Sequence, residues 1–327
     1  MKGSIFVFQS AKMFHIQYLI LLYFAFLVSS CSRDASFPFA PMKTKHVFIA
    51  VMDGARYSET WGDSQKKYIP NLNQLAQEGT VCTSFYNEGV TTTVPGHTAM
   101  ITGFYQNINN GGFELPAYSS VFQHYLFFSG SPPEDAWIFA SKDKLEVLSD
   151  CTEPGWAGKF RPRTDCGISG NHSGIREDSV TFSRLVDTLK KYHPHLVLIN
   201  FKQPDIAGHS NNWMEYIKQV SKTDAYIGTL WSYLQSDSIY KNTTALFVTN
   251  DHGRHPDGTA DGFVSHGDNC DGCRHILLLA AGPDFKKGFV CREKHSLIDI
   301  PPTVSRLLNF NFFSGEGSVM NDIFQGL

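Results

Sequence analysis

The sequence predicts an α/β fold, a three-layer α/β/α sandwich around a mostly parallel central sheet. Apolar runs typical of buried strands alternate along the 327 residues with stretches of helical spacing, and this alternation is typical of parallel sheets covered by helices on both faces. Three of the apolar runs are followed by an Asp, or by an Asp and a His. Ligands of such sheets bind beyond the carboxyl ends of the strands, so we expect these polar side chains to meet there.

The expected strands and helices follow one another in chain order. Residues 46–52 form an apolar run that ends at Asp53-Gly54, and residues 70–76 have helical spacing with Gly79 as a stop signal. A turn enters a helix at Thr93, with Pro95 near the first turn, where proline is tolerated. Further strands are expected at 195–201, 244–249 and 276–281, and further helices at 179–192 and 213–234.

The N-terminal residues are expected to direct export and not to belong to the fold. Lys2 and Lys12 precede an apolar run over 16–28, which is short for a membrane span and typical of a signal peptide. Small residues before Cys31 resemble a bacterial lipoprotein cleavage site. We therefore expect a signal peptide over 1–30 and a lipidated Cys31 with a tether over 31–43; ordinary cleavage after Ser30 is the alternative. The protein would then be an exported lipoprotein, periplasmic or on the cell surface, that touches the membrane through its lipid anchor only.

Six further cysteines follow Cys31, and an even number in an exported chain favours disulfides. Cys151 and Cys166 flank a loop that contains Gly and Pro, and they form the expected local pair. Cys270 and Cys273 form a CxxC motif. In an exported chain this motif favours a structural disulfide over a zinc site or redox chemistry.

Composition and charge limit the class of partner. With 42% hydrophobic and 18% charged residues, the chain has the composition of a globular protein, and its formal net charge is −3. That charge gives no basic balance, so a nucleic acid polymer is not expected as a partner.

Polar residues that follow the apolar runs form a candidate metal-binding set of three carboxylates and three imidazoles. The set is Asp53, Asp205, His209, Asp251, His252 and His266. Such ligands suit a borderline cation such as zinc, and six exceed what one tetrahedral ion needs. Two ions that clamp the attacking and leaving oxygens of phosphoryl transfer fit the set better. Each residue alone has an ordinary alternative, since Asp-Gly after a strand is usually a turn and a single His is usually a surface residue.

The segment from Thr91 to His97 contains a candidate nucleophile. It opens a helix, and the free N–H groups and the dipole of a helix start favour an anion. A metal-bound Thr at such a point can lose its proton and attack phosphorus. The alternative is that these threonines only cap the helix.

The order of these motifs resembles the alkaline phosphatase superfamily, most closely its nucleotide pyrophosphatase/phosphodiesterase-like and Thr-nucleophile phosphatase branches. The resemblance covers about residues 44–310 and rests on Asp53-Gly54, Thr93-x-Pro-x-His97, Asp205-x-x-Gly-His209, Asp251-His252-Gly253 and His266-Gly267. It implies an alkaline phosphatase-like catalytic domain over 44–327.

The resemblance also implies roles for individual residues. Thr93 would be the nucleophile that forms a phospho-threonine intermediate, which water then hydrolyses. Two Zn²⁺ ions would serve the reaction, although other divalent cations could replace them. One ion would be held by Asp53, Thr93, Asp251 and His252, and the other by Asp205, His209 and His266.

Two further features bear on the substrate, a small-molecule phosphate ester. Monoesterases of the superfamily carry a Lys-x-Arg pair that contacts the phosphoryl group, and Lys142 with Lys144 occupies a comparable stretch. Lys144 would replace Arg and lose its bidentate fork, and a solvated helix start is the alternative. Relatives also place an Asn 21 residues after the nucleophile, where this chain has Glu114. Either Asn107, Asn109 or Asn110 does that work, or substrate binds differently, so monoester and diester substrates both stay open.

Three other functions compete with a phosphoester hydrolase. A sulfatase would need Cys or Ser at the position of Thr93 for conversion to formylglycine. A phosphoglycerate mutase-like transferase would use Ser and would not be exported. A catalytically weak or inactive lipoprotein that binds metal or glycan on the same fold is expected to lack ligands, whereas all six are present. The residues define neither the leaving group nor the oligomeric state.

Overall fold

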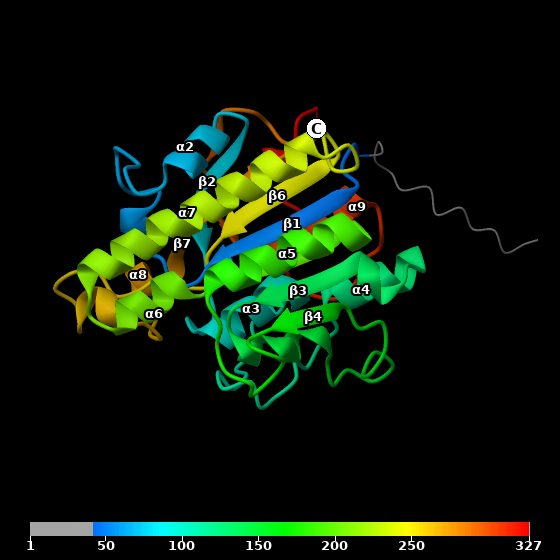
Figure 1. Ribbon diagram of the computed structural model, residues 1–327, viewed down its shortest axis with the longest axis horizontal. Helices are drawn as coiled ribbons and strands as arrows, with labels where there is room; N and C mark the ends of the chain where they lie inside the picture. The colour runs from blue at the N-terminus through cyan, green and yellow to red at the C-terminus, as the bar shows by residue number, and fades with distance from the viewer. Residues whose placement is uncertain (1–41, 327) are drawn as a thin grey trace, which may run out of the picture. The chain divides into compact units, whose positions relative to one another are not determined.

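A nine-stranded sheet runs through residues 42–326, the part of the chain that the computed structural model describes (Figure 1). Its strand order is β4-β3-β5-β1-β6-β7-β2-β8, with β9 paired to β2. Only β7 runs antiparallel to its neighbours, β6 and β2, and every other pair in the sheet is parallel. The prediction of a mostly parallel sheet is confirmed.

The strands and helices have the following bounds. The strands are β1 (His46–Met52), β2 (Gly79–Tyr86), β3 (Ala136–Ala140), β4 (Arg163–Cys166), β5 (Leu196–Phe201), β6 (Thr244–Thr249), β7 (His275–Ala281), β8 (Phe289–Cys291) and β9 (His295–Ser296). The α-helices are α2 (Pro70–Leu75), α3 (Thr93–Thr102), α4 (Val121–Ser129), α5 (Asp178–Tyr192), α6 (Gln203–His209), α7 (Trp213–Ser236), α8 (Asp271–Arg274) and α9 (Ile300–Leu308). Short 3-10 helices are η1 (Tyr57–Glu59), η2 (Pro133–Asp135), η3 (Asp143–Ser149), η4 (Gly262–Val264), η5 (Leu297–Asp299) and η6 (Asn321–Ile323).

The sheet separates two hydrophobic cores, as strand β1 shows. All seven of its residues are buried, and alternate side chains enter opposite cores. Val47, Ile49 and Val51 pack with residues of α3, α4 and α9. Phe48, Ala50 and Met52 pack with residues of α2, α5 and α7, and Figure 1 shows α5 and α7 lying across that face. Each buried large aliphatic side chain contributes about 1.5–3 kcal/mol, so a strand buried on both faces fixes the centre of a three-layer α/β/α sandwich.

The predicted elements are confirmed, with two differences that affect the site. The four predicted strands correspond to β1, β5, β6 and β7, and the predicted helices correspond to α2, α3, α5 and α7. The residues after β5 form helix α6, which was not among the predicted helices; Pro204 supplies a favourable first turn. Strand β7 runs antiparallel to β6, to which it is joined by a segment that contains only the short helices η4 and α8.

The predicted disulfide between Cys151 and Cys166 is not formed in the structure. The Cys166 thiol donates to the Ile138 carbonyl beneath β3, whereas the Cys151 thiol bonds the side chain of Gln123 on α4. The two cysteines therefore face different parts of the interior.

The expected signal peptide over 1–30, Cys31 and nearly all of the tether lie outside the described residues. Within residues 42–326, no helix has the length and apolar character that crossing a membrane requires.

Candidate active site

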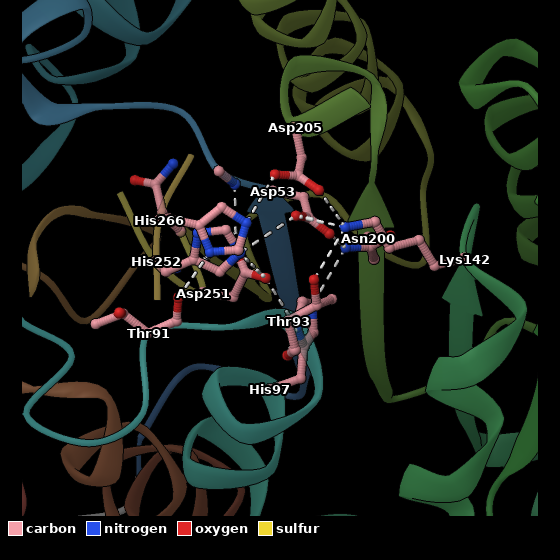
Figure 2. A network of polar contacts seen from close by, with 12 residues as sticks. Asp53, Thr91, Thr93, His97, Lys142, Asn200, Asp205, Asp251, His252 and His266 are labelled. Carbon is pink, nitrogen blue, oxygen red and sulfur yellow. Dashed lines mark hydrogen bonds and ion pairs between the residues drawn. The ribbon is translucent and has the colours of Figure 1, made fainter. Parts of the chain in front are cut away.

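The predicted polar residues meet beyond the carboxyl ends of three adjacent parallel strands, β5, β1 and β6. Asp53 directly follows β1, Asp251 follows β6 after one intervening residue, and Asp205 lies on α6 just after β5. Figure 2 shows these three carboxylates converging with His252, His266 and Thr93. The long sequence separations are bridged because β1 pairs directly with both β5 and β6.

Asp53, Asp251 and His252 form the first group of candidate ligands, and all three side chains are fully buried. Nε2 of His252 lies 3.4 Å from Oδ2 of Asp251 and 3.7 Å from Oδ1 of Asp53. Nδ1 of His252 lies 2.9 Å from the Gly253 carbonyl, so Nδ1 donates and Nε2 presents a lone pair to the group.

Two atoms of this first group test whether a cation fits. Oδ2 of Asp251 and Nε2 of His252 are buried, and neither forms a hydrogen bond in the described structure. A buried polar atom without a partner costs about 1–3 kcal/mol, and a cation between the two atoms would remove that cost. The donor set of two carboxylates and an imidazole therefore fits a divalent ion.

Asp205, His209 and His266 form the second group. Nε2 of His209 and Nε2 of His266 lie 3.3 Å and 3.4 Å from Oδ1 of Asp205, and 3.1 Å from each other. Asp205 and His209 both lie on helix α6, and they meet because residues four apart project from one helix face. Nδ1 of His266 is held 2.8 Å from the Thr91 carbonyl, which directs Nε2 to the group. Separations near 3.3 Å match the edges of a tetrahedron with bonds of about 2.0–2.1 Å.

The two groups are in contact. The rings of His252 and His266 stack with centroids 3.7 Å apart, so one imidazole from each group packs on the other. The two candidate ligand groups therefore adjoin.

Thr93 and Lys142 connect the groups. Thr93 is the first residue of α3 and is 1% exposed. Nζ of Lys142 donates to Oγ1 of Thr93 at 2.9 Å, to Oδ1 of Asp53 at 2.9 Å and to Oδ2 of Asp205 at 2.7 Å. The buried ammonium thus touches the candidate nucleophile and one carboxylate from each group (Figure 2).

The charges in the site shift one another's titration. Burial opposes ionisation of both Asp205 and Lys142, yet the Lys142 ammonium holds the pKa of Asp205 well below its usual range. Asp205 and Asp53 in turn raise the pKa of Lys142. Burial and the neighbouring Asp251 raise the pKa of Asp53 to about 6, and burial lowers the pKa of His252 to about 3. His252 is therefore neutral near pH 7, which is the protonation state that binds metal.

A cavity of about 330 Å³ opens beside Thr93. Lys142, Lys144 and Asn110 are among the residues that line it. Lys144 reaches it from the start of η3, and Asn110 lies opposite, with its amide oxygen accepting from Nζ of Lys144 at 3.1 Å and from the Val94 N–H at 2.9 Å. Glu114 does not line the cavity. Its side chain is exposed and accepts from the Asn109 N–H at 2.8 Å.

Three residues outside the predicted ligands and nucleophile complete the polar network, and one of them, His97, belongs to the Thr93-x-Pro-x-His97 motif. Asn200 donates to Oδ2 of Asp53 at 2.8 Å, and Nδ1 of His97 lies 3.4 Å from Oδ2 of Asp251. Nη1 of the fully buried Arg254 donates to Oδ1 of Asp205 at 2.5 Å. Asn200 carries a sequence signal, because it interrupts an otherwise apolar strand. The sequence signal for Arg254 is only its position directly after Asp251-His252-Gly253.

Two glycines permit the close approach of these segments. Gly54 has φ +65°, and a Cβ there would lie 2.8 Å from both the Arg254 guanidinium and the Asp205 carboxylate. A Cβ on Gly96 would lie 2.4 Å from the Asp251 carbonyl oxygen. Helix α3 therefore packs directly against the segment that carries Asp251 and His252.

Comparison with known proteins gives a family match over more than half of the chain. A family model described as the Metalloenzyme superfamily matches residues 135–312. Ectonucleotide pyrophosphatase/phosphodiesterase family member 7 of Mus musculus is 28% identical over 243 residues, which are 65% of this chain and 51% of that protein. The chain thus spans about half the length of this curated relative.

Two solved structures share the fold. A protein in the alkaline phosphatase superfamily from Vibrio parahaemolyticus has a TM-score of 0.58 at 17% identity, over 83% of this chain and 68% of that one. Murine ectonucleotide pyrophosphatase/phosphodiesterase 5 has a TM-score of 0.60 at 16% identity, over 86% of this chain and 100% of that one.

Proposed function

Because this chain belongs to the metalloenzyme superfamily and has the fold of the alkaline phosphatase superfamily, we propose that it hydrolyses phosphate esters of small molecules with the aid of two divalent ions. The observation that carries the proposal is the convergence of two ligand groups on Thr93. Each group contains carboxylate and imidazole ligands, and Lys142 links both groups to the Thr93 hydroxyl.

The ligand groups assign the ions, which we propose to be Zn²⁺. Asp53, Asp251 and His252, with Oγ1 of Thr93, would hold one ion; Asp205, His209 and His266 would hold the other. Oxygen and imidazole ligands suit zinc, although other divalent ions accept the same donors. When bound, such ions lower the pKa of coordinated hydroxyl groups and neutralise the charge that develops on phosphoryl oxygens.

Thr93 is proposed as the nucleophile. Its Oγ1 would form a bond to phosphorus while the bond to the leaving oxygen breaks, giving phospho-threonine and a released alcohol. Water would then attack the same phosphorus, restore the Thr93 hydroxyl and release phosphate, or a phosphomonoester when the substrate is a diester. Lys142 is not proposed as the base for this step, because Asp205 and Asp53 raise its pKa. Its role would be to orient Oγ1 and balance the phosphoryl charge.

Lys144 and Asn110 are proposed to bind the phosphoryl group in the cavity. Lys144 supplies a second positive charge there. The oxygen of the Asn110 amide is already used by Val94 and Lys144, which leaves its nitrogen available to donate to a phosphoryl oxygen. Asn110 would therefore do the work for which the sequence offered three candidate asparagines.

The test is a turnover assay with p-nitrophenyl phosphate and bis-p-nitrophenyl phosphate. Zinc-loaded protein is expected to hydrolyse at least one of them, chelator-treated protein neither, and Thr93→Ala neither. Thr93→Ala should keep the ions bound by the other six ligands. Absence of turnover by zinc-loaded wild type, or equal turnover by Thr93→Ala, would reject the hydrolase and favour a binding protein on the same fold. The ratio of the two rates decides between monoester and diester.

A sulfate ester is included in the same assay as the competing substrate. The proposal expects little turnover of p-nitrophenyl sulfate, because Thr93 cannot be converted to formylglycine. Faster hydrolysis of the sulfate than of either phosphate would replace the proposed substrate class.

A further inference from the structure

A second kind of ligand cluster lies on the segment between β6 and β7, apart from the six residues assigned above. It consists of His255, Asp268, Cys270 and Cys273, whose ligand atoms all lie within 4.8 Å of one another. Nε2 of His255 is 3.1 Å from Oδ2 of Asp268, and both thiols are hydrogen-bonded to the Asp268 carboxylate. Four side chains from a stretch of 19 residues, 255 to 273, thus point at one another.

The composition of this cluster is that of a zinc site. Two Cys sulfurs, one imidazole and one carboxylate are all zinc ligands, and thiolates disfavour magnesium and calcium. Bonds of about 2.0–2.3 Å arranged as a tetrahedron place ligand atoms about 3.3–3.8 Å apart, so small side-chain movements would bring the four atoms to one ion. All four ligands come from the protein, as in closed structural sites and unlike the open sites of catalysis.

The surroundings of His255 orient it for this purpose. Its Nδ1 lies 3.1 Å from Oδ1 of Asp261 and 3.2 Å from Oγ of Ser265, which leaves Nε2 facing the cluster. An imidazole held by a carboxylate on the far nitrogen is the usual support of a zinc ligand. The CxxC turn is also ordered, because Asp268 Oδ1 accepts the Cys270 N–H at 3.0 Å and the Cys270 carbonyl accepts the Cys273 N–H at 3.1 Å.

Backbone contacts join the cluster to the active site. The Gly253 N–H donates to the Cys273 carbonyl at 2.8 Å, and the Arg254 N–H donates to the Gly272 carbonyl at 3.0 Å. The Thr91 hydroxyl donates to the Asp268 carbonyl at 2.7 Å. These bonds fix the segment that carries His252 at one end and His266 near the other.

We propose that His255, Asp268, Cys270 and Cys273 bind a structural zinc ion that fastens this segment. The ion is additional to the two of the proposed hydrolytic centre and does not depend on that function. The proposal replaces the disulfide that the sequence favoured for Cys270 and Cys273. Both thiols are free in the structure, and a disulfide would leave His255 and Asp268 aimed at sulfurs that could no longer ligate.

Cobalt substitution tests the proposal, because Co²⁺ bound by thiolates shows intense near-ultraviolet charge-transfer absorption that oxygen and nitrogen ligands do not give. The six ligands of the active site include no sulfur. Full-length protein stripped with a chelator and titrated with Co²⁺ is expected to develop this band, with a final intensity that corresponds to one thiolate-bound ion per chain. Cys270→Ser/Cys273→Ser should abolish the band.

Two matched variants test whether the band arises from Cys270 and Cys273 and not from another site. Cys82→Ser/Cys291→Ser removes the other paired thiols, which lie near His295 and Asp322, and should keep it. Asp251→Ala, which removes an active-site ligand, should also keep it while losing one other ion. In the wild-type protein, absence of phosphoester turnover with the band present would reject only the hydrolase, and turnover without the band would reject only the structural site.

A second measurement uses the unaltered protein and does not depend on a variant folding. Cys270 and Cys273 should resist alkylation in zinc-loaded protein and react once a chelator is added. The proposal is overturned if wild-type protein gives no thiolate band, if the band disappears only in the Cys82/Cys291 variant, or if peptide mass spectrometry finds Cys270 and Cys273 joined in the protein as isolated.

Discussion

Nζ of Lys142 lies 2.9 Å from Oγ1 of Thr93 and contacts Asp53 and Asp205 at the same time. One buried ammonium therefore bonds two carboxylates that lie far apart in the chain, and it does so at the hydroxyl proposed as nucleophile. The Lys142 ammonium and the proposed ions therefore compete for the same carboxylates, because the metal-free fold needs a positive charge beside them and the ions need them as ligands.

Replacement of Lys142 by Met is expected to destabilise the metal-free protein by about 3–5 kcal/mol, because it removes the ammonium that bonds two buried carboxylates. Asp205 would then keep Arg254 as its one charged hydrogen-bond partner, and Asp53 would lose its ammonium partner. Added Zn²⁺ should recover much of that loss by supplying positive charge to the same oxygens. The free energy of unfolding in urea, with and without the metal, measures both effects. Lys190→Met, an exposed change on α5, serves as the control. Equal stability of metal-free Lys142→Met and wild type would contradict the prediction.

Single ligand variants should each remove one ion from the proposed hydrolytic centre. Asp251→Asn is expected to lower the zinc content by one ion per chain through the first group, and His209→Gln by one ion through the second. Because each ion is needed, turnover should fall by about 10²-fold or more in both variants. Elemental analysis after dialysis gives the stoichiometry, with exposed Asp187→Asn as the control. Unchanged zinc in either variant would refute that ligand set.

The monoester rate should fall as the pH rises through about 8. Burial, and then repulsion from Lys142, lower the pKa of Lys144 to about 8, so the side chain is charged below that pH and neutral above it. The charged form is the one that attracts a phosphoryl group, which sets the sign of the change. Lys144→Arg stays charged and should move the falling limb of kcat/KM upward by at least about one pH unit. Superimposable pH profiles for the two proteins would show that Lys144 does not contact the substrate.

Asn110 and Glu114 offer a paired test of phosphoryl binding. Asn110→Asp keeps the oxygen that accepts from Val94 but replaces the donor nitrogen with negative charge. It is expected to reduce kcat/KM for phosphate esters by about 10²-fold, the effect of losing one well-placed donor. Glu114→Gln, whose side chain is exposed, should leave kcat/KM within about twofold. A larger loss from Glu114→Gln than from Asn110→Asp would indicate that the residue at position 114, and not Asn110, contacts the phosphoryl group.

Much of the site could be anticipated because its residues stand where strands end. Asp53 and Asp251 follow fully buried apolar runs, and such runs indicate both the strand and the edge at which it delivers the next residue. The strands β1, β5, β6 and β7 were predictable on the same ground. Strands β3 and β4 are only five and four residues long, and short runs carry little periodicity.

The sequence could not show contacts that depend on tertiary packing. Arg254 approaches Asp205 because Gly54 and Gly208 leave room for its guanidinium, and no local pattern reveals that space. Cys151 and Cys166 are close in sequence, but α4 and β3 give them separate partners. The CxxC motif was visible, whereas its convergence with His255 depends on the fold of the segment between β6 and β7.

Strand β1 lies between β5 and β6, so Val47 pairs with Leu196 on one side and with Ala245 on the other. During translation Asp53 emerges from the ribosome long before β5, β6 or His266 has been synthesised. A nascent chain that ends before His266 carries an incomplete centre, and β1 has neither of its neighbours until most of the polypeptide has emerged. Lys142 can meanwhile supply the charge that the carboxylates need as the sheet closes. Loading with ions is therefore expected to be a late event in biogenesis, one that follows assembly of the sheet and does not guide it.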